Sequence, residues 1–222
     1  MYSINDVVKA LKKDVVNQQG VINISLADLS LDIQAKDIIG NSLQEWLAVW
    51  FDKNGIKYRV LANTQEFPDY IIEFNGVESY LDIKTWNRAS SPAFDLANFN
   101  SYIDSLEQNP KKIDADYLIF GYLSNPNGFI VKDIFLKKIW EMTGQSGTDP
   151  LKIQKKKGIV YNIRPMPFYR TVNNTFRNRL EFLEGLTETK RKYANQGTNI
   201  PDMDTWKENI INNYFHLTGT VL

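Results

Sequence analysis

The sequence contains no cysteine and a single histidine, His216. Without cysteine the chain cannot form disulfides or thiolate zinc sites. With one histidine, a nuclease site built on paired histidines cannot form within one chain, and a Ser-His-Asp hydrolase site would need His216 itself. We expect this histidine, in Tyr214-Phe215-His216-Leu217, to be a core or surface residue. Carboxylates and lysine are left as the available catalytic groups.

The chain also has no net charge and no long apolar run. The chain has 26 basic and 26 acidic residues, whereas a non-specific nucleic-acid binder would normally be basic, because phosphate contacts dominate its affinity. The neutral total still allows a local basic cleft. No run approaches the ~18 apolar residues of a membrane helix, and the N-terminus lacks the apolar stretch of a signal peptide. The expected compartment is therefore the cytoplasm.

The composition indicates a globular α/β protein. The 222 residues are 43% hydrophobic and 13% aromatic, which suits one domain, or one domain with a small appendage. Helix, strand and helix patterns alternate, which predicts a mixed central β-sheet flanked by helices (α+β). We expect a core over 1–170 with an N-terminal helical and strand extension, and a C-terminal helical segment over 171–222 packed on the same domain. The expected helices are 3–17, 36–54, 95–106, 133–142, 175–194 and 202–217, and the expected strands or hairpins are 21–33, 57–62, 69–84, 116–122, 129–132 and 158–164.

Two acidic residues flank a hairpin signal. Pro68-Asp69 and Asp82 lie in β-rich runs on either side of Asn75-Gly76, and Asn-Gly between such runs is typical of a type I′ turn. A two-residue turn there pairs residues whose numbers sum to 151, which places Asp69 opposite Asp82. Opposed carboxylates repel each other, and a divalent cation between them would remove that repulsion.

Lys84 lies on the same face of the predicted strand as Asp82, because side chains alternate along a strand. Leu81, Ile83, Tyr70 and Ile72 fall on the other face, which we expect to be core. This P-D…D-x-K arrangement can build a metal site for phosphodiester cleavage. The alternative is an exposed strand face with an ion pair between Asp82 and Lys84. Glu73 and Glu78 also oppose each other in this register and are interpreted as an exposed hairpin tip.

A third carboxylate, Glu45, lies in the preceding predicted helix, from which it could bind metal directly or through water. Its alternative role is the last residue of a capping box that begins at Ser42, which fails if the helix starts near residue 36. Gln44 is a lesser candidate for the same site.

Basic and polar residues could contact DNA. Lysines cluster before the strand at 158–164, and a polar loop follows the strand that carries Lys84. A run of charge is usually a solvated face, but Arg or Lys to guanine is the commonest specific contact in the major groove. The candidate DNA-binding residues are Asn87, Arg88, Ser90, Lys155, Lys156, Lys157 and Arg164.

The P-D…D-x-K motif resembles that of the PD-(D/E)xK nucleases, and further segments are similar to the NgoBV/NlaIV-type restriction endonucleases. Together these segments cover roughly residues 36–165. The second acid is Asp82 rather than glutamate, which the superfamily tolerates. The matching segments are 40–47 (GNSLQEWL), 92–97 (PAFDLA), 116–122 (DYLIFGY) and 163–165 (IRP).

The resemblance implies a homodimer that uses Mg²⁺ to cut both strands of double-stranded DNA at a short palindrome of the GGNNCC type, leaving 5′-phosphate ends, with a cognate DNA methyltransferase in the host. Asp69 and Asp82 would bind the metal, with the Ile83 carbonyl as a further ligand and Glu45 serving a second metal or a bridging water. Lys84 would position the attacking water. A structure-specific or repair nuclease and an inactive nuclease-fold DNA-binding protein remain as alternatives.

Overall fold

The computed structural model describes residues 3–33, 38–63, 66–171, 173–195 and 202–222. Its contacts divide the chain into two compact units. Unit 1 comprises 1–91 and 116–137, and unit 2 comprises 92–115 and 138–222. The boundary expected at residue 170 lies inside unit 2, and the division into domains stays a prediction. Within the described residues, no helix is long and apolar enough to cross a membrane.

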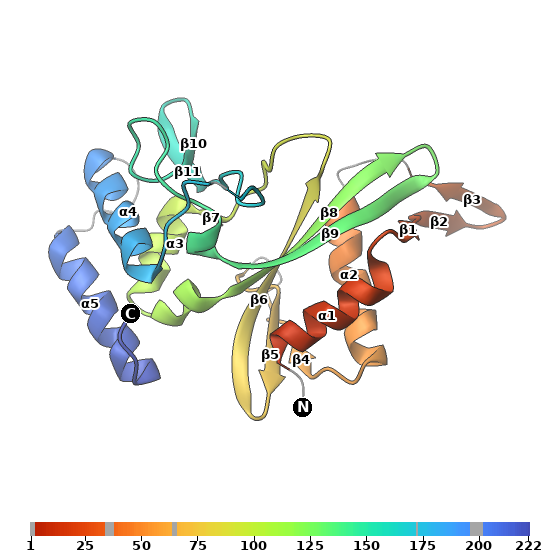
Figure 1. Ribbon diagram of the computed structural model, residues 1–222, viewed down its shortest axis with the longest axis horizontal. Coiled ribbons are helices and arrows are strands. Elements are labelled where there is room, and N and C mark those ends of the chain that lie inside the picture. The colour runs from red at the N-terminus through yellow and green to blue at the C-terminus, as the bar shows by residue number, and fades with distance from the viewer. Residues whose placement is uncertain (1–2, 34–37, 64–65, 172, 196–201) are drawn as a thin grey trace. The chain divides into compact units, whose positions relative to one another are not determined.

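Unit 1 is built on a six-stranded sheet of order β1-β9-β8-β6-β5-β4 (Figure 1). Strands β6 and β8 are parallel, and β6 pairs antiparallel with β5. This is the predicted mixed sheet. The elements of unit 1 are α1 (Ile4–Val15), β1 (Gln19–Gly20), β2 (Asn23–Leu26), β3 (Leu29–Asp32), α2 (Ile39–Lys53), β4 (Tyr58–Arg59), β5 (Tyr70–Phe74), β6 (Val77–Asn87), β8 (Asp116–Asn125) and β9 (Gly128–Lys138), which ends one residue into unit 2.

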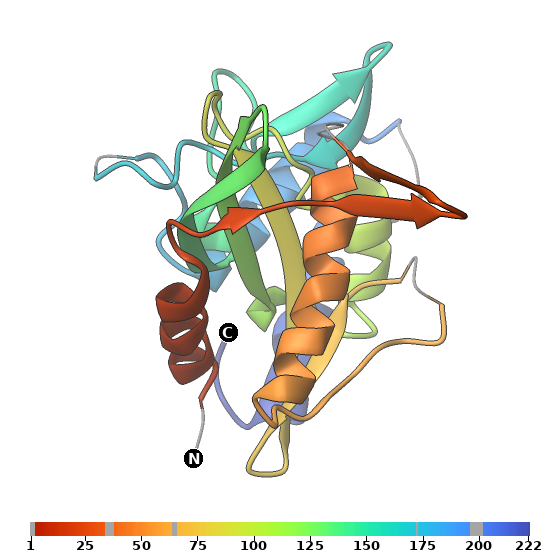
Figure 2. The same ribbon diagram turned by 90° about the vertical axis from the view of Figure 1, so that its right-hand side faces the viewer.

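Helices α1 and α2 cover one face of this sheet. Ser3 caps α1 through a capping box with Asp6, as the predicted helix start required. The apolar stripe of each helix joins one core with the inward residues of β5, β6, β8 and β9 (Figure 2). This core includes Leu11, Leu43, Leu47, Phe51, Tyr70, Ile72, Leu81, Ile83, Leu118 and Phe120.

The helix predicted over 133–142 is wrong. Strand β9 continues to Lys138, and only a 3₁₀ turn, η3 (Ile139–Glu141), follows. Asp133 before an apolar run and Lys137-Lys138 near its end resemble helix start and stop signals. Pairing beside the buried strand β8 decides the outcome instead, because tertiary context overrides weak local preference.

Unit 2 combines a three-stranded sheet of order β10-β11-β7 with helices α3, α4 and α5. The segment predicted as helix from residue 95 is strand β7 first, and α3 begins at Phe99 with Asn98 as its N-cap. The elements of unit 2 are β7 (Ala97–Asn98), α3 (Phe99–Leu106), η2 (Pro110–Asp114), η3, β10 (Ile153–Lys156), β11 (Ile159–Ile163), α4 (Arg179–Lys192) and α5 (Met203–Thr218).

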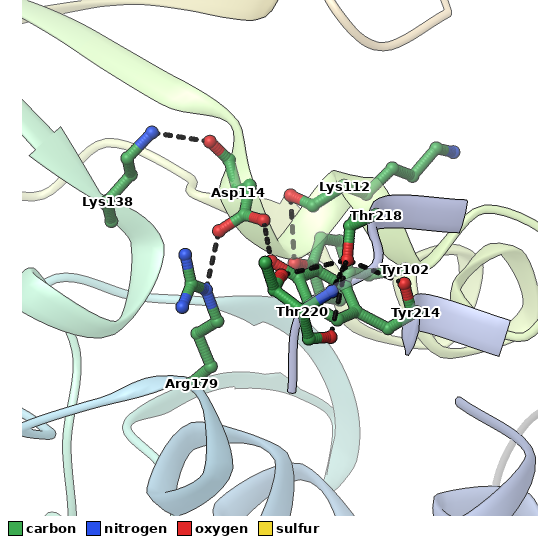
Figure 3. Close-up of polar contacts among 8 residues, drawn as sticks. All are labelled: Tyr102, Lys112, Asp114, Lys138, Arg179, Tyr214, Thr218 and Thr220. Carbon is green, nitrogen blue, oxygen red and sulfur yellow. Dashed lines mark hydrogen bonds and ion pairs between the residues drawn. The ribbon is translucent and has the colours of Figure 1, made fainter. Parts of the chain in front are cut away.

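Asp114 of η2 forms hydrogen bonds with both C-terminal helices of unit 2 (Figure 3). Its Oδ1 accepts a hydrogen bond from Arg179 Nε of α4 at 2.6 Å, and its Oδ2 accepts one from the Tyr214 hydroxyl of α5. Its backbone carbonyl accepts from Lys138 Nζ at 2.6 Å. One residue at the end of η2 therefore anchors three elements that are distant in sequence.

Candidate active site

The hairpin that carries the P-D…D-x-K motif has the predicted turn and register. Asn75 and Gly76 have φ values of 55° and 79°, as a type I′ turn requires. The strand pairs run from Phe74↔Val77 to Tyr70↔Leu81, and each pair sums to 151. Asp69 directly precedes β5, so the predicted pairing of Asp69 with Asp82 falls one position beyond the last paired residues.

Asp69 is held by hydrogen bonds from two elements. Its Oδ2 accepts from the backbone N–H of Ile83 at 2.6 Å, and its Oδ1 accepts from Gln44 Nε2 at 3.1 Å. The Tyr70 hydroxyl donates in turn to the Gln44 carbonyl at 2.7 Å. Helix α2 and the hairpin are therefore joined at Gln44, and the Asp69 carboxylate is fixed beside β6.

Asp82 is a buried carboxylate, with 5% of the residue exposed. Lys84 lies on the same strand face, and its Nζ forms an ion pair with Asp82 Oδ2 at 2.7 Å. Burial raises the pKa of Asp82 to about 6; the Lys84 charge opposes this rise, and the negative charge of Asp69 adds to it. The two aspartate carboxylates are therefore close enough to repel each other, as two carboxylates of one site would.

An aromatic cluster lies beside Asp82. Tyr117 of β8 is paired with Asp82 across the parallel ladder and is fully buried. The Phe67 ring centre lies 6.3 Å from the ring centres of both Tyr80 and Tyr117. Phe67 therefore joins Tyr80 and Tyr117 in one aromatic cluster, whose Tyr117 is the strand neighbour of Asp82. Tyr117 could not be predicted as a neighbour of Asp82, because the order of residues does not reveal which strand pairs in parallel with β6.

Glu45, unlike Gln44, lies on the exposed side of α2. The pKa of Tyr70 is raised to about 12, mainly by burial and then by the charges of Asp69 and Tyr58, and the charge of Glu45 adds a smaller contribution. Gln44 is the α2 residue that contacts Asp69. The catalytic and metal-binding roles of Glu45, and the ligand role of the Ile83 carbonyl, stay predictions.

The donor set suits a hard divalent cation. Among the described residues, no three histidine or acidic side chains converge on one point. Mg²⁺ does not require such a cluster, because it is commonly held by one or two carboxylates and keeps several waters. Asp69 and Asp82, whose mutual repulsion a cation would relieve, fit that requirement.

The predicted DNA-binding residues of unit 1 form the turn that ends β6. Asn87 Oδ1 accepts from the Ala89 N–H at 3.0 Å, and the Ser90 carbonyl accepts from Trp86 Nε1 at 2.8 Å. Arg88 stacks 4.4 Å from the Trp86 ring centre, and its Nε forms an ion pair with Asp133 Oδ2 at 2.8 Å. Contact with DNA by Asn87, Arg88 and Ser90 stays a prediction.

The predicted DNA-binding residues of unit 2 lie on or beside the β10–β11 hairpin. Lys155 Nζ pairs with Asp149 Oδ2 at 3.0 Å, and Lys156 Nζ lies 3.8 Å from the Tyr161 ring centre. Lys157 is exposed in the turn. Arg164 directly follows β11 and pairs with Asp95 through Nε and Oδ1 at 3.0 Å. Their contact with DNA also stays a prediction.

Known proteins match this chain in sequence and in fold. The family model of the NgoBV restriction endonuclease matches residues 1–222. The chain belongs to this family. The type II restriction enzyme NlaIV of Neisseria lactamica is 37% identical over 175 residues, which are 78% of this chain and 72% of that enzyme. The type II restriction enzyme NgoBV of Neisseria gonorrhoeae is 32% identical over 149 residues, covering 66% of this chain and 84% of that enzyme.

A solved structure supports the same conclusion for the fold. The NlaIV restriction endonuclease matches with a TM-score of 0.88 and 29% identity, covering 100% of this chain and 92% of that one. The resemblance inferred from the P-D…D-x-K hairpin and its companion segments is thus confirmed at the level of family and fold. The roles of individual residues rest on the geometry described above.

Proposed function

We propose that this protein is a Mg²⁺-dependent type II restriction endonuclease that hydrolyses phosphodiester bonds in both strands of double-stranded DNA. The observation that carries the proposal is the buried Asp82 carboxylate, with Lys84 Nζ 2.7 Å away and Asp69 close enough to raise its pKa. Membership of a restriction endonuclease family supports it. Burying charge is costly, and an ion pair on a solvated strand face would not require it.

Asp69 and Asp82 would hold the cation, which supplies Lewis-acid polarisation of the phosphate and a bound water of lowered pKa. The Ile83 N–H and Gln44 Nε2 fix the Asp69 carboxylate in one orientation. The ammonium group of Lys84 lies beside Asp82. There it would stabilise the negative charge that develops on the phosphate and position the attacking water. Glu45 would reach the site from α2 as a further metal or water ligand.

The target site, the homodimer, the products and the methyltransferase are inferred from family membership. The substrate would be a short palindrome of the GGNNCC type, cut by a homodimer to leave 5′-phosphate ends. A cognate methyltransferase would protect the host DNA, and the enzyme would act in the cytoplasm. Asn87, Arg88, Ser90, Lys155, Lys156, Lys157 and Arg164 are the candidate DNA contacts.

Cleavage of plasmid DNA tests the proposal. Purified protein is incubated with plasmid and Mg²⁺, and the fragment ends are sequenced. We expect discrete fragments that share one palindrome, and no cleavage in EDTA. Lys84→Met should abolish cleavage, whereas Glu78→Gln, at the exposed tip of the same strand, should cut normally. A smear of fragments would instead indicate a nuclease without sequence preference, and intact plasmid an inactive nuclease fold.

A further inference from the structure

The β2–β3 hairpin carries an uncovered apolar face. Its register pairs Ile24 with Leu31 and Leu26 with Leu29, so all four aliphatic side chains lie on one side. They are between 54% and 80% exposed. The hairpin, which we call the arm, projects from unit 1 beyond β1 (Figure 1).

The opposite face of the arm is polar and forms its own hydrogen bonds. Asn23 Nδ2 donates to Asp32 Oδ1 at 2.9 Å, and the hydroxyls of Ser25 and Ser30 donate to Asn23 Oδ1 at 2.9 and 3.0 Å. The polar face of the arm is suited to contact with water, whereas the aliphatic face is not. An isolated two-stranded hairpin is marginally stable in water, so the arm requires a surface against its apolar face.

A complementary groove lies at the root of the arm in the same unit. It has a volume of about 520 Å³ and runs between α1, β1, α2 and the sheet. Trp46, on the outer face of α2, is 41% exposed at its edge. Most of the wall of the groove is apolar. The apolar lining residues are Val15, Val21, Ile22, Leu43, Trp46, Phe120, Phe129 and Val131.

We propose that the arm of one copy of this chain packs its apolar face into the groove of a second copy. One unit carries both surfaces, so the contact made by the first copy can be repeated by the second, which gives a closed two-fold dimer. The inference rests on the homodimer of the proposed function and names the surface that forms it.

The charge of the arm favours this occupant. Residues 21–33 contain Asp28 and Asp32 but no lysine or arginine. A phosphate backbone or an anionic membrane surface would require basic residues there. An apolar protein surface is the partner whose chemistry fits.

The apolar area of the arms is of the size that a small dimer interface needs. At about 30 Å² per buried carbon, the four exposed aliphatic side chains offer roughly 350 Å² on each arm. The two arms of a dimer would together remove about 700 Å² of apolar surface from water, to which the walls of the two grooves would add, so the contact approaches the lower end of the range of specific interfaces, roughly 1,200 Å².

Hydrodynamic measurements on purified protein without DNA test the arm. In the variant Leu26→Glu/Leu29→Lys, opposite charges replace a directly paired couple, so the hairpin keeps a favourable cross-strand pair but loses its apolar face. The matched control Ser25→Glu/Ser30→Lys places the same charges on the neighbouring pair of the polar face. Sedimentation analysis should show a dimer for the wild type and the control, and a dimer dissociation constant at least 100-fold higher for the apolar-face variant.

Cysteine cross-linking tests the groove, because the native chain has no cysteine to interfere. Ser42 lines the groove. Mixing Leu29→Cys and Ser42→Cys chains under oxidation should give a mixed disulfide dimer, whereas Ser30→Cys mixed with Ser42→Cys should not. Cross-linking of Leu29→Cys to itself, in preference to Ser42→Cys, would overturn arm-in-groove packing.

A monomeric wild type, or an unchanged dimer in the apolar-face variant, would overturn the proposed surface. Neither result depends on nuclease activity. A wild type that cuts at discrete sites but fails these tests retains the proposed function, and an inactive dimer that passes them retains the interface.

Discussion

Two hairpins of unit 1 follow the same alternation but have opposite surroundings. In the β5–β6 hairpin, the apolar face packs against α1 and α2, and the other face carries Asp82 and Lys84. In the β2–β3 hairpin, the polar face is the one with satisfied partners, and the apolar face is exposed. The comparison shows that alternation specifies two faces, whereas the rest of the fold decides which one is covered.

The largest effect should come from the buried carboxylate of the β5–β6 hairpin. Asp82→Asn removes a charge that we place in the reaction, and losing one preorganised group typically costs roughly 10²–10³-fold in rate. Single-turnover cleavage at saturating Mg²⁺ measures it. The same measurement on Asp32→Asn, on the polar face of the arm, should show wild-type rates; equal losses in both would contradict the assignment.

Truncating one leucine in each hairpin sharpens the contrast in packing. Leu81 is 1% exposed in the core, whereas Leu29 is 80% exposed. Leu81→Ala should lower the free energy of unfolding by about 2–5 kcal/mol, and Leu29→Ala should change that of the dissociated monomer by about 0.5 kcal/mol or less. Urea denaturation of dilute protein gives both values, and similar losses would show that the arm is covered within one chain.

The raised pKa of Asp82 predicts a pH-dependent cost of its burial. A folded-state pKa of about 6, above the ordinary aspartate value of 3.8, means that the folded state binds this proton more tightly than the unfolded chain. The associated stability is present below pH 4 and is lost as the pH rises through 6. Asp82→Asn should therefore gain stability over the wild type from pH 4 to 7, measured by thermal unfolding in EDTA. A constant offset across that range would contradict the shift.

The turns should give small effects on stability, with opposite signs. Gly76 has a φ of 79°, where a side chain is strained, so Gly76→Ala should cost about 1 kcal/mol. Ala27 already adopts a φ of 51° in the turn of the arm, so Ala27→Gly should stabilise the protein by roughly 0.5 kcal/mol or more. Chemical denaturation compares the two variants, and equal signs would show that the turns do not differ as described.

The sequence predicted what depends on local chemistry. The Asn75-Gly76 turn, the 151 register and the core face of the β5–β6 hairpin are all present, because turn type and alternation follow from the residues themselves. The strand over 133–138 and the pairing of Tyr117 with Asp82 depend on contacts between distant segments. For the same reason, the choice of Gln44 over Glu45 as the contact to Asp69 could not be read from spacing alone, since it depends on the rotation of α2.

The hydrogen bond from the Ile83 N–H to Asp69 Oδ2 has a consequence for the choice of an inactive variant. The carboxylate takes the place that a strand carbonyl would occupy next in the ladder, so it also holds the end of β5 to β6. Asp69→Ala would remove this acceptor and fray the hairpin, whereas Asp69→Asn keeps an amide oxygen at the same position. Slow hydrogen–deuterium exchange at the Ile83 amide would identify the variant that preserves the binding surface, which is the one suited to trapping an uncleaved DNA complex.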